Sequence, residues 1–401
     1  MRGVRLPVRK NRPGGCTHRI AERTVEAVKQ KQIPLLDLRA QHRQIRDEVL
    51  AEVVRVIDSQ KFIMGEDVQK LEQDIAAYSG TPYAIGCASG SDALFLALLA
   101  VGIGHGDEVL TTPYTFFATA GAIHRAGAVP VFVDIEEATF NMDMNQVADV
   151  LAAHPKIKAA IPIHLFGACA DLDPLCEMAA GHRIAVIEDA AQSIGSEYKG
   201  RRAGSIGDIG CFSFFPSKNL GGYGDGGMLT TRDAALRERL AALRVHGSKR
   251  KYYHDWVGIN SRLDALQAAV LRVKFRYLDA WTCARQRNAD LYRRWIAELK
   301  IPVVPPAAAA YQTRHIYNQF SIVCRRRDEL QAYLKEEGIG TEVYYPLPLH
   351  LQVCFEGLGY HPGDFPVSER LAKQSLALPV HPELAEADIE HICRTLQAFY
   401  A

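Results

Sequence analysis

The sequence predicts an α/β protein with a large, mostly parallel-sheet domain and a smaller C-terminal α+β domain. Strand-like and helix-like patterns alternate between about residues 79 and 231, which is typical of parallel sheets. A proline- and alanine-rich connector, IPVVPPAAAAYQ (301–312), precedes a separate strand–helix–strand pattern. The 401 residues, 48% of them hydrophobic, suffice for a large core and for two or three domains.

The N-terminal half holds most elements of the expected sheet. Apolar residues from Ile45 to Val56 recur at helical spacing and predict an amphipathic helix. SGTPYAIGCASGSDALFLALLAVG (79–102) predicts a strand, a glycine turn and a helix that begins near Ser91. Further helices are expected in TFFATAGAIHRAG, at about 143–153 and from about Asp171. Further strands are expected in DEVLTT, AVPVFVD, KAAIPIHLF, RIAVIEDAA, GCFSFF and GGMLTT.

The C-terminal half is more helical. RDAALRERLAALR (232–244) predicts a helix, and residues 261–299 form a very long helical pattern that we expect to be broken once. After the connector, YNQFSIVC predicts a strand, DELQAYLKEEG a helix and GIGTEVYYP a strand-like segment. We therefore expect a basic tail over 1–32, a large domain over 33–284 and a small domain over 285–401.

The composition argues against several classes of protein. The net charge of +1 gives no overall bias towards nucleic acid or anionic membranes. No apolar run reaches the roughly 20 residues that span a bilayer. The nine cysteines are scattered, without CxxC or zinc-finger spacing, and are interpreted as reduced, buried thiols. We expect a cytoplasmic protein with no metal, nucleic-acid or membrane partner.

Residues 1–31 differ from the rest, because they hold nine Lys or Arg and two Glu with little apolar periodicity. No hydrophobic run follows the positive charges, so a secretory signal is not expected. A disordered tail or an over-extended start is the favoured interpretation. A nucleic-acid-binding arm is disfavoured because no aromatic residues interleave the charges.

Three stretches carry groups suited to chemistry. VIEDAAQSIG (186–195) ends a strand with Asp189 and Gln192, where open α/β sheets bind ligands, although an Asp there can also simply cap a turn. ASGSDAL (88–94) places a helix N-terminus where it could bind an anion, although ordinary capping is the alternative. Lys218 follows the strand GCFSFF, and a lysine in a partly apolar site has a lowered pKa and becomes nucleophilic.

Together these groups are the parts of a site for pyridoxal 5′-phosphate. Lys218 would form an imine, Asp189 would pair with the ring nitrogen and the helix start would hold the phosphate. Phe116 could cover the ring, although it could also be an ordinary core aromatic. GYGDGG (222–227) matches the dinucleotide-binding pattern, but we reject that interpretation because a strand, GGMLTT, follows it.

Six motifs, in order, make the sequence resemble the pyridoxal-phosphate-dependent sugar aminotransferases of the DegT/StrS family, which have fold type I. The resemblance runs from about residue 33 to the C-terminus and implies a homodimer with a shared active site. The six motifs are ASGSDAL, TPYTFFATA, VIEDAAQSIG, FSFFPSKNLGGYGDGG, GINSRLDALQAAVL and VYYPLPLH.

The resemblance also implies roles for individual residues. Lys218 and Asp189 match the catalytic lysine and the partner of the pyridine nitrogen, and Gln192 a residue near the ring hydroxyl. The other implied cofactor residues are Gly90, Ser91 and Asp92 at the helix start, Ser213, Phe116 and Asn260. Ser91 and Ser213 match phosphate ligands, Phe116 matches the aromatic residue on the ring, and Asn260 matches a residue that reaches the phosphate from the neighbouring subunit. Arg262 and Tyr345 match substrate contacts, with helix-surface charge and small-domain packing as their alternatives.

The expected reaction moves an amino group from an amino acid, which the resemblance suggests is glutamate, to a nucleotide-linked keto-sugar. HGSKRKYYHDWVGINSRLD and YYPLPLH favour 3-keto over 4-keto substrates. One alternative is another fold-type-I enzyme that acts on free amino acids. A second is a regulatory or sensing relative without turnover, which would be expected to have lost the lysine or the carboxylate that this chain keeps.

Overall fold

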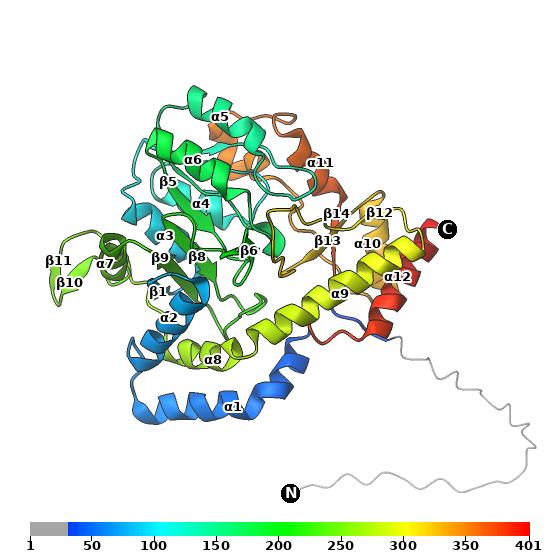
Figure 1. Ribbon diagram of the computed structural model, residues 1–401, viewed down its shortest axis with the longest axis horizontal. Helices are drawn as coiled ribbons and strands as arrows, with labels where there is room; N and C mark the ends of the chain where they lie inside the picture. The colour runs from blue at the N-terminus through cyan, green and yellow to red at the C-terminus, as the bar shows by residue number, and fades with distance from the viewer. Residues whose placement is uncertain (1–30) are drawn as a thin grey trace, which may run out of the picture. The chain divides into compact units, whose positions relative to one another are not determined.

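A seven-stranded sheet forms the centre of the protein (Figure 1). The computed structural model describes residues 31–401, and residues 32–401 form one compact unit. Most of the expected tail over 1–32 lies outside the described residues. The strands follow the order β1 (Tyr83–Cys87), β9 (Gly227–Thr231), β8 (Ile209–Ser213), β5 (Ala185–Asp189), β4 (Ile157–Ala160), β2 (Glu108–Thr111) and β3 (Val129–Phe132).

The sheet is parallel from β8 to β3, and only β9 runs antiparallel to its two neighbours. The predicted α/β fold with a mostly parallel sheet is therefore confirmed. Because parallel strands end at one edge, β5 and β8 deliver the segments after Asp189 and Ser213 to the same place. This edge holds the site described below.

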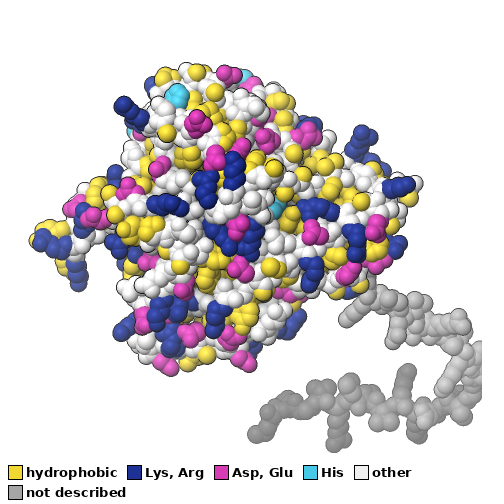
Figure 2. Space-filling view, in the orientation of Figure 1, with side chains coloured by type: hydrophobic (Ala, Val, Ile, Leu, Met, Phe, Trp, Pro, Cys, Tyr) yellow, Lys and Arg dark blue, Asp and Glu magenta, His cyan; other side chains and the backbone are white. Residues whose placement is uncertain are grey.

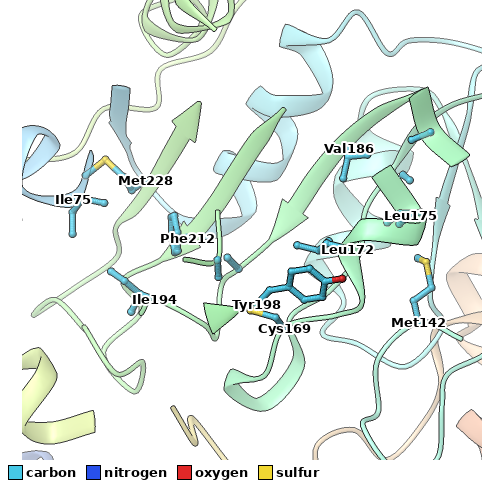
Figure 3. Packing of buried hydrophobic residues seen from close by; sticks show 14 of the residues in the cluster. Ile75, Met142, Cys169, Leu172, Leu175, Val186, Ile194, Tyr198, Phe212 and Met228 are labelled. Carbon is cyan, nitrogen blue, oxygen red and sulfur yellow. The ribbon is translucent and has the colours of Figure 1, made fainter. Parts of the chain in front are cut away.

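Residues alternate between two cores on the two faces of the sheet. Ile187 and Cys211 pack with helix α3 (Gly90–Ala100) on one face. Val186 and Phe212, their neighbours along the strands, pack into the core on the other face (Figure 3). This alternation follows from the two-residue period of a strand. Helix α3 is apolar and almost wholly buried, so its N-terminus is held firmly against the sheet.

The other helices of this part are α1, α2, α4, α5, α6, α7, α8 and α9. Most lie where the sequence predicts a helix, and the long pattern over 261–299 is broken once, between α8 and α9. Their bounds are α1 (Leu38–Ser59), α2 (Glu66–Ser79), α4 (Ala118–Arg125), α5 (Met144–Ala153), α6 (Leu172–His182), α7 (Ala234–Leu243), α8 (Ala265–Phe275) and α9 (Leu278–Glu298). A short 3₁₀ helix, η1, spans Leu165–Gly167. Two small hairpins, which the sequence analysis did not assign, pair β6 (Glu197–Tyr198) with β7 (Arg201–Arg202) and β10 (Ser248–Arg250) with β11 (Tyr253–His254).

A second sheet of three antiparallel strands lies in the C-terminal part. It is formed by β12 (Val303–Val304), β13 (Phe320–Cys324) and β14 (Ser375–Leu378). Leu278, at the start of α9, belongs to the core of the large sheet, whereas Ala289 and Tyr292 belong to the C-terminal core. The remaining elements here are α10 (Arg327–Glu336), η2 (Leu349–Leu351), η3 (Val353–Leu358), α11 (Pro366–Gln374) and α12 (Glu386–Tyr400). The division at 284/285 falls within α9 and stays a prediction.

The prediction of a strand-like segment in GIGTEVYYP (338–346) is wrong. The segment makes only single bridges, from Ile339 to Ile33 and from Glu342 to Ala377. Gly338 has a φ of 74°, which an extended strand does not adopt. After Glu342 the chain leaves β14 and brings Tyr344 and Tyr345 to a cavity, so no ladder continues.

The surface is mixed in charge. Figure 2 shows Lys and Arg interspersed with Asp and Glu over the visible face. None of the helices within residues 31–401 has the length and apolar character needed to cross a membrane.

Candidate active site

A cavity of about 310 Å³ lies where β5 and β8 end and α3 begins. Its walls come from segments that are far apart in the sequence, and most of the predicted site residues meet there. These are Gly90, Ser91, Phe116, Asp189, Gln192, Ser213, Lys218 and Tyr345.

Lys218 faces this cavity from the loop that follows β8. Its backbone N–H donates to the Phe215 carbonyl at 2.9 Å, and the Gly222 N–H donates back to the Phe214 carbonyl at 2.8 Å, so the loop closes on itself. Gly221 must be glycine here, because a Cβ would lie 2.3 Å from the Pro216 carbonyl oxygen. The following element is the strand β9, as expected when the dinucleotide interpretation was rejected.

The amine of Lys218 has an unusual pKa. Burial lowers it from 10.5 to about 8, although the Asp189 carboxylate acts in the opposite direction. A substantial fraction of the amine is therefore neutral near pH 8. A neutral amine is the form that attacks an aldehyde and accepts a proton.

Asp189 ends β5 as a buried carboxylate. Its Oδ2 accepts a hydrogen bond from Thr119 Oγ1 at 2.8 Å, and its Oδ1 accepts one from the Ala191 N–H at 3.2 Å. Burial raises the pKa of Asp189, and these bonds and Lys218 only partly offset that effect. It forms no ion pair with any described side chain, so a bound cation such as a protonated pyridine nitrogen would stabilise it.

Thr119 was not predicted as a site residue, although it holds the Asp189 carboxylate in one orientation. Thr119→Val removes the hydroxyl without changing the volume much, so we expect about 10-fold weaker binding of pyridoxal 5′-phosphate, equivalent to about 1.4 kcal/mol. Titration of the apoprotein by absorbance measures this. Thr119→Ser keeps the hydroxyl and should bind near the wild-type level; wild-type binding by Thr119→Val, or equal weakening in both variants, would contradict a specific role of the hydroxyl.

The neighbouring Glu188 has a different role. It points into a fully buried site, where its oxygens accept hydrogen bonds from the N–H groups of Gly204, Ile206 and Gly207, each at 2.7 Å. His164 Nδ1 accepts the Ala170 N–H, so its Nε2 carries the proton donated to Glu188 at 2.8 Å. Glu188 thus ties the segment that leads into β8 to strand β5 and to His164.

Glu188→Gln is expected to destabilise the fold by about 3 kcal/mol near neutral pH, because all four donors lose a charged acceptor and the amide –NH₂ leaves two of them with no acceptor. Burial opposes ionisation, but the hydrogen bonds from His164 and the backbone hold the pKa of Glu188 below its ordinary value of 4.5. The stabilisation is therefore complete above pH 4.5 and is lost as the pH falls towards the lower folded-state pKa. Urea unfolding of both proteins from pH 7 to pH 3 should show the difference shrinking; a constant difference would refute an ionised Glu188.

The start of α3 forms the other end of the cavity. Ser89, not Ser91, is the N-cap, and its Oγ accepts the Asp92 N–H at 3.1 Å. The N–H groups of Gly90 and Ser91 then remain without partners inside the helix, at its positive end. A Cβ on Gly90 would lie 2.6 Å from Ser213 Cβ, so glycine allows the helix to approach β8. Such an N-terminus suits a phosphate dianion.

Aromatic and amide side chains cover the cavity. Phe116 is 56% exposed, and its ring centroid lies 6.0 Å from that of Tyr345. The Tyr345 hydroxyl accepts a hydrogen bond from Gln192 Nε2 at 3.1 Å, and Gln192 Oε1 accepts the Phe166 N–H at 2.7 Å. Burial raises the pKa of Tyr345, so its hydroxyl stays protonated at neutral pH.

Three predicted residues do not line this cavity. Asp92 turns away, and its carboxylate accepts a hydrogen bond from Arg125 at 3.1 Å. Asn260 is exposed and pairs with Val245 through its backbone, and Arg262 is half-buried beside it. The predicted action of Asn260 in a neighbouring subunit and the predicted contact of Arg262 with the substrate stay predictions.

Several lining residues were missed by the sequence analysis. Ser89 could have been found, because Ser-x-x-Asp is a capping pattern. Thr119 gave no signal, since its role depends on the packing of α4 beside β5. The missed residues include Ser89, Thr115, Thr119, Ser217, Asp225, Gln319 and Tyr344.

The family follows from comparisons with known proteins. A model of the DegT/DnrJ/EryC1/StrS aminotransferase family matches residues 43–397. The chain is 50% identical over 368 residues to a pleiotropic regulatory protein of Geobacillus stearothermophilus, covering 92% of this chain and 98% of that one. It is 44% identical over 365 residues to a UDP-N-acetyl-3-dehydro-α-D-glucosamine 3-aminotransferase of Acidithiobacillus ferrooxidans, covering 91% and 97%.

A solved structure is also similar to this protein in fold and sequence. The crystal structure of DesV from S. venezuelae, in complex with a ketimine intermediate, superimposes with a TM-score of 0.89 at 39% identity and covers 92% of this chain and 98% of that one. The fold, the cavity and these matches agree. The chain therefore belongs to the DegT/DnrJ/EryC1/StrS aminotransferase family.

Proposed function

We propose that this protein transfers an amino group from glutamate to carbon 3 of a nucleotide-linked keto-sugar, with pyridoxal 5′-phosphate as its cofactor. The observation that carries the proposal is the meeting of Lys218, Asp189 and the start of α3 in one cavity. The preference for carbon 3 is supported by the 44% identity to a 3-aminotransferase of a UDP-linked sugar. We further propose that the protein is cytoplasmic and forms a homodimer.

The described residues fit the cofactor. The N–H groups of Gly90 and Ser91 would hold its phosphate with Ser213, Asp189 would pair with its ring nitrogen, and Phe116 would cover its ring. When bound, pyridoxal 5′-phosphate acts as an electron sink that stabilises negative charge on the substrate carbon.

The chain's own groups supply the proton chemistry. Lys218 Nζ, with its pKa lowered to about 8, accepts the proton from the α-carbon of the donor. Thr119 and the Ala191 N–H keep the Asp189 carboxylate in place during the reaction. Phe116 and Tyr345 limit the access of water from above.

The test uses purified protein, pyridoxal 5′-phosphate, L-glutamate and a panel of UDP- and dTDP-linked 3- and 4-keto-sugars, read by mass spectrometry. We expect an aminosugar nucleotide from a 3-keto substrate. Amination of the 4-keto sugars alone would refute the carbon-3 preference, and turnover of free keto acids alone would refute the sugar substrate.

A regulatory role is the second candidate, because the 50% identical relative is named a pleiotropic regulatory protein. Retention of both Lys218 and Asp189 in the cavity argues against a role without turnover. DNA binding by the full-length protein, together with no aminotransferase activity on any substrate of the panel, would favour the regulator.

A further inference from the structure

A small side chamber of about 40 Å³ adjoins the main cavity. Ser217, Gln319 and Tyr344 line both spaces, and Ser217 directly precedes Lys218. The volume exceeds the roughly 15 Å³ that one water needs and suits a carboxylate group, whereas a sugar ring is too large. The rest of its wall is formed by Arg285, Asn318 and apolar groups: Leu35, Leu36, Ala377, Leu378 and Val380.

Arg285 is the charged group of this chamber. It comes from α9 and is only 4% exposed. One terminal nitrogen, Nη1, donates to the carbonyl oxygens of Tyr317 at 3.2 Å and Asn318 at 3.5 Å. Its Nε is buried without a hydrogen-bond partner. A guanidinium has five N–H donors, so much of its capacity is unused.

No carboxylate among the described residues forms an ion pair with Arg285. Burial lowers its pKa to about 10, and the field of Glu383, which lies beyond ion-pair distance, opposes this shift only partly. Buried charges are normally paired, so an unpaired guanidinium beside a cavity indicates an anionic ligand.

The alternative is that Arg285 only clamps the backbone at Tyr317 and Asn318. Arg327 shows what such a clamp looks like in this protein. It is 9% exposed, and its Nη1 donates to the carbonyl oxygens of Ala372 and Ser375 at 3.1 and 3.0 Å. It also pairs with Asp328 and lines neither space. Arg285 has the clamp contacts without the partner, and it lines a chamber.

We infer that Arg285 receives a carboxylate of the amino-acid donor in this side chamber. The inference rests on the proposed function and assigns the donor a subsite that the keto-sugar does not use. A planar carboxylate matches the fork of a guanidinium, and the chamber places it next to the loop that carries Lys218. The diphosphate of a nucleotide-linked sugar is too large to enter this chamber together with its attached groups, and so is the sugar ring.

The test exploits the two-step course of transamination, in which the donor and the acceptor react in turn. In such a scheme kcat/KM for each substrate reports only its own half-reaction. Arg285→Met should lower kcat/KM for L-glutamate on the order of 100-fold and leave kcat/KM for the keto-sugar near the wild-type value. Arg285→Lys keeps the charge, so its kcat/KM for L-glutamate should lie between the values of the wild type and of Arg285→Met. Arg327→Met is the matched control and should change neither value.

A binding measurement complements the kinetics. Calorimetric titration of the holoenzyme with glutarate, a dicarboxylate without an amine, should give a Kd that Arg285→Met weakens and Arg327→Met does not. L-alanine and 4-aminobutyrate distinguish the two carboxylates of glutamate: a loss confined to L-alanine assigns the α-carboxylate, and one confined to 4-aminobutyrate the distal one.

An equal loss of both kcat/KM values in Arg285→Met and Arg285→Lys, or unchanged values in both, would overturn the inference in favour of the clamp. The donor half-reaction is also followed alone, through the visible band of the cofactor. If the wild-type band responds to glutamate but no keto-sugar is aminated, the acceptor in the proposed function is wrong, while the half-reaction still decides the role of Arg285.

Discussion

Replacing Lys218 with alanine is expected to lower transamination by about 10⁴-fold or more. The variant lacks the amine that we propose binds the cofactor covalently and moves the proton, and no other lysine lines the cavity. The purified variant should also lack the visible absorption band that we expect of the wild type with pyridoxal 5′-phosphate. Aminosugar formation is measured by mass spectrometry and the band by absorbance.

Lys274 offers a matched control. It is 2% exposed on α8, burial lowers its pKa to about 8, and its amine donates to the Gly221 carbonyl oxygen. It lies outside the cavity, so Lys274→Met should keep the visible band. Loss of the band in Lys274→Met, with retention of the band in Lys218→Ala, would show that Lys274 and not Lys218 binds the cofactor.

The pH dependence of cofactor capture offers a further check on Lys218. The rate at which the apoprotein reacts with pyridoxal 5′-phosphate should rise with pH and level off above about 8, because the neutral amine attacks and the Lys218 pKa is about 8. A rate that still rises steeply to pH 10 would indicate an unperturbed amine.

Asp189→Asn is expected to reduce turnover by about 10³-fold, the size of effect seen when a preorganised electrostatic group is removed. The amide keeps the shape of the carboxylate but cannot stabilise a positive charge on a ring nitrogen. Thr119 and the Ala191 N–H each donate to a different oxygen of Asp189. An asparagine amide has one oxygen, so it can accept only one of these two hydrogen bonds. Steady-state kinetics with glutamate and a keto-sugar measure the loss.

The thermal midpoint and far-UV spectrum of Asp189→Asn should stay close to the wild type, because the substitution removes a buried charge that lacks an ion-pair partner. Activity within about tenfold of the wild type would mean that Asp189 is not the partner of the ring nitrogen. Loss of folding would instead assign Asp189 a structural role like that of Glu188.

Glu188 and Asp189 show where sequence reasoning reaches its limit. They are adjacent carboxylates at the end of one buried strand, and the pattern VIEDAA does not say which faces the ligand. In the structure, Glu188 accepts four donors in a closed pocket, whereas Asp189 faces the cavity. The resemblance selected Asp189, and the opposite orientation of successive strand residues supplies the physical reason.

Hydrophobic periodicity predicted the helices and strands that bury one face. It failed for segments whose structure depends on pairing with residues far away in the sequence. The helix from Ile45 to Val56 and the break within 261–299 follow from local patterns. The segment 338–346 has the residues of a strand, but its pairing depends on where β14 lies, and β14 was not assigned from the sequence.

The sequence by itself determined the α/β class, the order of the main strands and helices between residues 79 and 299, and the lysine, carboxylate and helix start that suit a pyridoxal phosphate site. These features are local, because they depend on side-chain period, caps and glycine turns. Only the tertiary structure decided which groups share the cavity, including Thr119 beside Asp189 and Arg285 in its side chamber. Such neighbours come from distant segments, and their meeting depends on how α4, α9 and the sheet pack, which no local pattern encodes.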